Sequence, residues 1–337
     1  MSSTNLNPNT LPRRERKRGA WDLAILAGLI IAVVLGLFGM AAATGWEETI
    51  AQVSKLSWTQ VGILLALSLA NYLLRCLRWH IFATHLGLPT KLIQNARHFL
   101  GGLAMAVTPG RLGEFVRMRW LRRETGWTLE KTAPLLLVDR ASDLAAMAAL
   151  LAIALALSTS GISGAFPIAI LGLAAALVST RPRLLALAAD IGYRIVGRWP
   201  RLFARVRTAA RSLGRFSNPT LMTLAVVIGA IGWLAEGYAF HLLLVWMGAN
   251  VSLASAIAIF MFSTIAGGLT GAPGGIGGAE AAMVALLSIE GVPLEVSLPA
   301  TAIIRLTTLW FAIVIGMIVF PFAERHSIKV RNALEEH

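Results

Sequence analysis

The 337-residue sequence is 56% apolar with a formal net charge of +13, and its mean hydropathy is +0.70. Several runs of about 20 apolar residues can each span a bilayer, which excludes a soluble globular domain and predicts a polytopic membrane protein. The single cysteine, Cys76, excludes a disulfide within the chain, and the six histidines form no ligand pair. We therefore expect no metal and no cofactor, and we expect the arginine-rich charge to meet anionic lipid rather than nucleic acid.

The first segments alternate between basic and apolar. Residues 1–20 contain a basic run and predict a disordered cytoplasmic tail. Residues 21–43 resemble a signal peptide, but the apolar run is long for one, which favours an uncleaved first span. A second span is expected at about residues 60–81. Near its end lie three residues that we interpret as an anchor at the cytoplasmic interface: Arg75, Arg78 and Trp79.

Residues 93–125 form two short arms around a break at Pro109-Gly110. Neither arm alone spans a bilayer comfortably, so we predict a re-entrant helical hairpin on the cytoplasmic face. The second arm carries the charged residues Arg111, Glu114, Arg117, Arg119, Arg122 and Arg123. We interpret the last three as charges that only set the topology.

The third span is expected at about residues 132–157 and a short fourth at about 167–178. The third carries Arg140 and Asp143, three residues apart and thus on one helix face. The arginine-rich connector, residues 181–217, has apolar residues at helical spacing. Either it is an amphipathic helix on the inner leaflet or it is a solvated basic loop, and both interpretations stay open.

The second half repeats this order. A fifth span is expected at about residues 221–247 with Glu236 inside, and residues 252–290 again read as arm, break and arm. A sixth span is expected at about 298–320 with Arg305 inside. With both termini cytoplasmic and each hairpin returning to the side it entered, Lys55 is the only cation in an outer loop. This topology places the first hairpin on the cytoplasmic side and the second on the outer side.

Corresponding residues recur at offsets of 164 to 166 residues, which predicts a duplication. The matched pairs are Pro109-Gly110 with Pro273-Gly274, Gly113 with Gly277, Glu114 with Glu280, Asn71 with Glu236, and Arg140 with Arg305. Three crossings separate equivalent points, so we expect an all-α fold of two inverted repeats, each with a broken re-entrant hairpin. A single transmembrane domain, 21–323, would hold repeat one at about 60–180 and repeat two at about 219–323, followed by a cytoplasmic tail, 324–337.

These motifs resemble the flippase-like transmembrane domain family, the membrane region of lysylphosphatidylglycerol synthases/flippases and of stand-alone relatives. The residues that carry the resemblance are Pro109, Gly110, Gly113, Glu114, Arg117, Arg140, Asp143, Pro273, Gly274, Gly275, Ile276, Gly277, Glu280, Arg305, Thr308 and Trp310. The resemblance covers residues 20–323 and implies translocation of a lipid between leaflets. It does not imply lysyl transfer, because the synthases carry that activity in a soluble C-terminal domain, and we expect no enzyme.

Each candidate residue has a functional and a structural interpretation. Arg140 and Arg305 could bind a lipid phosphate, with Asp143 orienting Arg140 and Glu280 as the partner of Arg305, or they could form structural ion pairs. Glu114 and Glu280 could contact the headgroup, carry a proton or cap half-helices. The remaining candidates are Arg111 and Arg117, for a headgroup or as interface cations, and Asn71 and Glu236, for the cavity or for interhelical hydrogen bonds.

We therefore expect a flippase-like transporter in the plasma (cytoplasmic) membrane. It would pass an anionic or phosphate-bearing lipid through a polar midplane cavity. An intramembrane enzyme acting on a lipid-linked phosphate or sugar, and a scaffold that only binds anionic lipid, are the alternatives. The expected partners are membrane lipids, with a second copy of the chain and a separate lipid-synthesising enzyme left open, and no nucleic acid.

Overall fold

The computed structural model describes residues 54, 56–106, 108, 113–158, isolated positions between 167 and 178, 181–197, 214–216 and 218–335. The expected tail 1–20, the first span and the centre of the first break, with Pro109, Gly110 and Arg111, lie outside these residues. All regular structure in the described part of the chain is helical. The chain is therefore an all-helical polytopic membrane protein, as its apolar pattern predicted.

The described helices form two series joined by the short helices α8 (Pro182–Val196) and η3 (Gly214–Phe216). The first series is α3 (Trp58–His85), α4 (Leu92–Gly102), η1 (Leu103–Met105), α5 (Gly113–Thr125) and α6 (Leu129–Leu157). The second is α10 (Pro219–Trp246), α11 (Leu253–Leu269), η4 (Pro273–Gly275), α12 (Gly278–Ile289), α13 (Leu294–Arg305), the π-helical turn η5 (Leu306–Trp310) and α14 (Phe311–Glu335).

Helix starts follow local capping chemistry. Ser57 and Gln60 exchange side-chain and backbone hydrogen bonds of 3.2 and 2.8 Å, which satisfies free N–H groups at the start of α3. Asn218 Oδ1 accepts from the Thr220 N–H at 3.0 Å, directly before Pro219 at the first position of α10. These caps place both long helices within two residues of their expected starts.

Within the described residues, four helices are long and apolar enough to cross a membrane. They are α3, α6, α10 and the continuous stretch Leu294–Ala333 that joins α13, η5 and α14. The last is longer than the sixth span expected from the sequence, because the helix continues past Phe320 to Glu335. The expected tail from residue 324 is thus helical over most of its length.

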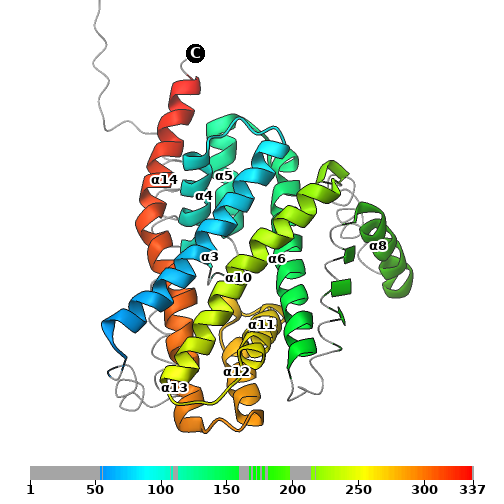
Figure 1. The fold of residues 1–337 in the computed structure, drawn as a ribbon. Helices are drawn as coiled ribbons and strands as arrows, with labels where there is room; N and C mark the ends of the chain where they lie inside the picture. The colour runs from blue at the N-terminus through cyan, green and yellow to red at the C-terminus, as the bar shows by residue number, and fades with distance from the viewer. Residues whose placement is uncertain are drawn as a thin grey trace, which may run out of the picture. The chain divides into compact units, whose positions relative to one another are not determined.

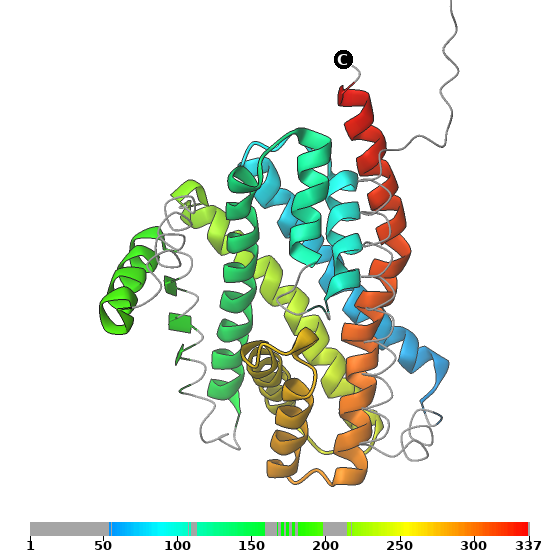
Figure 2. The ribbon, with the colours of Figure 1, turned by 180° about the vertical axis from the view of Figure 1, so that it is seen from behind.

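Two pairs of short helices lie at opposite ends of the bundle in both views (Figures 1 and 2). The pair α4 and α5 lies at the end where α14 finishes, and α11 and α12 lie at the end where α13 begins. Helix α14 packs on α4 and α5, α11 packs on α6 and α12, and α3 packs along α10.

Helix α8 covers part of the expected connector and confirms that this part is helical. Its exposed apolar residues include Leu187, Ile191 and Ile195, and Arg194 lies in its last turn. An exposed apolar stripe beside arginines is typical of a helix at a membrane surface.

Candidate functional site

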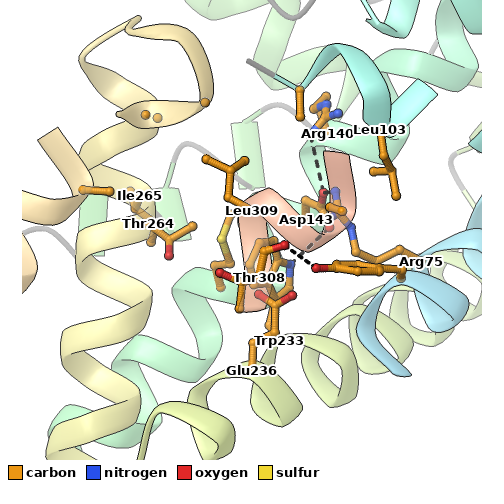
Figure 3. Close-up of a pocket in the computed structure, with 18 of the residues that line it drawn as sticks. Arg75, Leu103, Arg140, Asp143, Trp233, Glu236, Thr264, Ile265, Thr308 and Leu309 are labelled. Carbon is orange, nitrogen blue, oxygen red and sulfur yellow. Dashed lines mark hydrogen bonds and ion pairs between the residues drawn. The ribbon is translucent and has the colours of Figure 1, made fainter. Parts of the chain in front are cut away.

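A cavity of about 360 Å³ is lined by residues of both helix pairs. From the first pair it is lined by Gly102, Leu103, Met105 and Ala106 around the end of α4, and from the second by the end of α11 and by Gly274 and Gly275. Helices α3, α6 and α10 and the turn η5 supply the other walls. Figure 3 shows the polar side chains that point into it. Segments far apart in the sequence therefore form one site.

Asp143 on α6 is the centre of the polar side of the cavity. Its two carboxylate oxygens accept from Arg75 Nη2 at 2.7 Å, Arg78 Nη2 at 2.8 Å and Trp233 Nε1 at 3.2 Å, and Arg140 Nη1 lies 3.6 Å away. The expected pair of Arg140 and Asp143 is present but is the longest of these contacts. Asp143 therefore holds several arginines in place.

Arg78 lies behind this side of the cavity and is fully buried. Its Nη2 also lies 2.7 Å from Asp139 Oδ1, and Nε donates to the same oxygen at 3.2 Å. Trp79 is equally buried, and Arg75 is largely so. The interpretation of Arg75, Arg78 and Trp79 as an interface anchor is wrong, because the side chains face neighbouring helices and not the headgroup region.

Arg75 and Arg117 reach the cavity across aromatic rings. The Arg117 guanidinium carbon lies 4.2 Å from the centre of the Phe99 ring and 5.4 Å from that of Trp79. The Arg75 guanidinium carbon lies 5.2 Å from the centre of the Trp233 ring. Cation–π contacts stabilise a partly desolvated guanidinium without neutralising its charge. Arg117, singled out in the sequence, thus lines the cavity and is buried.

Arg305 closes the side of the cavity formed by the second break. Its Nε donates to Glu280 Oε1 at 2.5 Å, and its Nη2 donates to the Gly274 carbonyl at 2.8 Å. Glu280 Oε2 in turn accepts from the Gly277 N–H at 2.7 Å, at the start of α12. Both structural interpretations of Glu280 are therefore confirmed: the carboxylate pairs with Arg305 and caps its half-helix.

Glycines allow the second break to turn tightly. Gly274, Gly275 and Gly277 have φ between 63° and 84°, a region that favours glycine. A Cβ on Gly275 would lie 3.0 Å from the backbone of Gly267, so the break also packs closely on α11. The break is thus a defined structure that aims the Gly274 carbonyl at Arg305.

The turn η5 forms another wall. The Thr308 carbonyl in this π-helical turn accepts a hydrogen bond from the Tyr72 hydroxyl at 2.5 Å, in addition to one from the Phe311 N–H. Thr308 and Leu309 both line the cavity. Single π-helical turns occur frequently at functional sites.

The remaining predicted residues divide into three groups. Glu236 lines the cavity and is nearly fully buried, and Asn71 is fully buried. Gly113 and Glu114 begin α5, and the Glu114 side chain lies outside the description. Pro109, Gly110 and Arg111 are likewise undescribed. The structure therefore brings together Arg117, Arg140, Asp143, Glu236, Glu280 and Arg305.

A second polar cluster joins α5 to α14. Glu324 accepts hydrogen bonds from Arg119 Nη2 at 2.7 Å, from Trp120 Nε1 at 2.6 Å and from Arg123 Nη1 at 2.6 Å. The interpretation that Arg119 and Arg123 only set the topology is therefore wrong, since both bind α14. Arg122 is exposed, and that interpretation remains a prediction for it.

Sequence reasoning missed Arg75, Arg78, Asp139 and Trp233. A signal was present, because Arg75 and Arg78 are three residues apart on one span and Asp139 and Asp143 are four apart on another. Each spacing puts both charges on one helix face. Only the packing of α3 against α6 makes the two faces partners.

Comparisons with known proteins match the chain to a family of membrane proteins. The model of the family described as "Lysylphosphatidylglycerol synthase TM region" matches residues 25–316. Two proteins of Methanothermobacter thermautotrophicus, each named "UPF0104 membrane protein", are similar to shorter stretches. One is 27% identical over 103 residues, 31% of each chain, and the other is 26% identical over 127 residues, 36% of this chain and 38% of the relative. The matches span about a third of the length of each relative.

Proposed function

The chain belongs to the family of lysylphosphatidylglycerol synthase TM regions, and we propose that it moves a phosphate-bearing lipid between the two leaflets of its membrane. One observation carries the proposal: Arg75, Arg117, Arg140 and Arg305 converge on a cavity among helices long enough to cross a bilayer. Arginine at this depth is costly unless it is paired or hydrated, and it is the side chain best suited to bind phosphate.

The charge of the site favours an anionic group. Among the described side chains in or beside the cavity, the carboxylates are Asp139, Asp143, Glu236 and Glu280, and the arginines are Arg75, Arg78, Arg117, Arg140 and Arg305. Even with every carboxylate ionised, one positive charge is in excess. A lipid phosphodiester would neutralise it, and its oxygens would accept hydrogen bonds from guanidinium groups.

We assign roles on this basis. Arg140 and Arg305 contact the phosphate, and Arg117, with Arg111 beside the same break, receives the headgroup. Asp143 acts as a positioning residue, because its oxygens already accept from two guanidinium groups and an indole. Glu280 positions Arg305, and Glu236 remains the cavity carboxylate that no described cation approaches within ion-pair distance.

An inverted repeat would explain how the site opens to both leaflets. The two series share one order of long helix, short pair and long helix, and the short pairs lie at opposite ends of the bundle. We propose that repeats at about 60–180 and 219–323, within one transmembrane domain over 21–323, are related by inversion and rock around the cavity. The hairpin of each repeat then enters from its own side, with both termini cytoplasmic.

The test uses purified protein in liposomes that contain fluorescent phosphatidylglycerol. We expect wild-type protein to exchange the label between leaflets and Arg140→Gln and Arg305→Gln to lose most of that activity, while the exposed Arg122→Gln does not. If both cavity variants exchange lipid as fast as the wild type, the site is wrongly assigned. A new covalent lipid product, detected by mass spectrometry, would instead favour an intramembrane enzyme.

A further inference from the structure

One side of the cavity ends in residues that are half-buried or exposed. On α6, Arg140, Leu144 and Met147 follow one another at i, i+4 and i+7 and so line the cavity from a single helix face. Opposite them on α11 lie Thr264, Gly268 and Leu269. Figure 3 shows Thr264 across the cavity from Arg140 and Asp143. We call these six residues the lateral mouth.

Exposure rises sharply at the lateral mouth. Leu269, the last residue of α11, is 80% exposed, and the Arg140 side chain is 29% exposed. Deeper in the same walls, Asp143 and Phe260 are buried. Helices α6 and α11 pack together, but α11 ends at Leu269 while α6 continues alongside. The wall that α11 supplies therefore ends at Leu269, while the α6 wall with Arg140 goes on.

The chemistry of the lateral mouth matches one class of ligand. An arginine that reaches the cavity adjoins the apolar side chains Leu144, Met147 and Leu269. Helix α6 is long enough to cross a bilayer, and the mouth lies along its length and not at its end. Outward-facing surface at such a place meets lipid chains. A ligand whose phosphate binds the arginine and whose hydrocarbon contacts the apolar side chains has the composition of a membrane lipid.

The size of the cavity points the same way. At about 360 Å³ it lies near the lower limit of pockets that enclose a drug-sized ligand. A lipid with two acyl chains must leave most of its hydrocarbon outside, and each CH₂ that stays in an apolar environment adds favourable free energy. A chain needs a lateral opening for this, because the ends of the bundle lead to polar headgroups and water.

We propose that the acyl chains of the lipid leave the cavity sideways through the lateral mouth, while the phosphate is held inside by Arg140 and Arg305. The inference rests on the proposed function and deepens it, because it names the route and requires a ligand with hydrocarbon chains. Arg140 is the residue at which the polar and apolar parts of the ligand meet.

The experiment is photolabelling in proteoliposomes with phosphatidylglycerol that carries a diazirine in one acyl chain. Labelled residues are mapped by mass spectrometry. We expect enrichment at Leu144, Met147 and Leu269 over a matched exposed apolar groove lined by Ile231 and Leu234 on α10. Arg140→Gln should lower labelling at the mouth about tenfold, the effect of losing one charged hydrogen bond, and leave α10 unchanged.

A second variant tests the opening itself. Met147→Trp should lower both labelling at the mouth and leaflet exchange, whereas Leu234→Trp on α10 should change neither, with melting temperatures reporting the fold of both. Equal labelling of the mouth and α10, or mouth labelling that ignores both Arg140→Gln and Met147→Trp, would overturn the route. Enriched, Arg140-dependent labelling without leaflet exchange would support the binding route and reject transport, which separates the two proposals.

Discussion

Arg78 on α3 and Asp139 on α6 form an ion pair in which neither side chain has exposed surface, with Nη2 2.7 Å from Oδ1. The same guanidinium reaches Asp143, which lines the cavity. The pair thus connects the packing of two long helices to the position of the cavity arginines. Breaking this pair costs much free energy because it is buried: an ion that loses its partner in a low-dielectric interior has no water to take the partner's place.

We expect Arg78→Met to destabilise the protein strongly. The variant leaves Asp139 buried without its cation, which costs about 3–5 kcal/mol and lowers the melting temperature by roughly 10 °C. Thermal unfolding in detergent measures this. Arg122→Met, at an exposed position, should change the melting temperature little, and adding Asp139→Leu to Arg78→Met should restore part of the loss. An unchanged melting temperature in Arg78→Met would contradict the buried pair.

A glycine contact joins α14 to the end of the first helix pair. A Cβ on Gly316 would lie 2.0 Å from the Ala104 backbone nitrogen in η1, so the two backbones could not keep their spacing. We expect Gly316→Ala to destabilise by about 1–3 kcal/mol through overpacking. Gly62 on α3 has no heavy atom within 4 Å of such a Cβ, and Gly62→Ala should leave the melting temperature unchanged or slightly raised. Equal changes in melting temperature for the two variants would show that α14 does not pack closely against η1.

The ring of Phe99 should matter for transport through Arg117. Phe99→Leu removes the ring that lies 4.2 Å from the guanidinium, a contact worth about 0.5–2 kcal/mol, and should slow leaflet exchange several-fold. Phe99→Tyr keeps a ring and should restore the rate. The control is Phe82→Leu, which removes a buried ring packed on Phe216. If both leucine variants lose stability and transport equally, Phe99 has no special role.

The stability of the folded protein should decrease in two steps as the pH is lowered, through the titration of His98 and then of Glu124. The two residues lie outside the four candidate spans, and Glu124 Oε2 lies 3.1 Å from His98 Nε2. Burial lowers the pKa of His98 below 6.5. Burial raises the pKa of Glu124, but the hydrogen bond and charge of His98, with Gln94 and Arg97, outweigh this and hold it below its ordinary value of about 4.5.

In both groups the unfolded chain binds protons at a higher pH than the folded protein, so protonation favours unfolding. The melting temperature should therefore fall as the pH drops below about 6.5 through the titration of His98, and again below about 4.5 through that of Glu124. His98→Gln should remove the first step and Glu124→Gln the second. A melting temperature in wild-type protein that does not change from pH 8 to pH 4 would disprove both assignments.

Three long helices and the second break were predictable because local chemistry determines them. Apolar runs gave the ranges of α3, α6 and α10 to within a few residues, and glycine with proline gave the second break. The sequence left Glu280 or a substrate phosphate as the partner of Arg305, since a buried arginine needs an anionic partner, and the structure shows the pair with Glu280. By contrast, the extension of α14 to Glu335 was missed, because its last turns are polar and an apolar run therefore does not reveal them.

The sequence by itself determined that this is a helical membrane protein, where α3, α6 and α10 lie, and that Arg140, Asp143 and Arg305 fall inside apolar runs. Only the tertiary structure decided which charges meet. From the sequence alone, Arg75 and Arg78 were interpreted as an interface anchor. A cation near the end of an apolar run has the same sequence pattern whether its side chain faces lipid headgroups or a carboxylate on another helix. The packing of α3 and α10 against α6 turned them toward Asp139 and Asp143, because a buried guanidinium is stable only where such partners surround it.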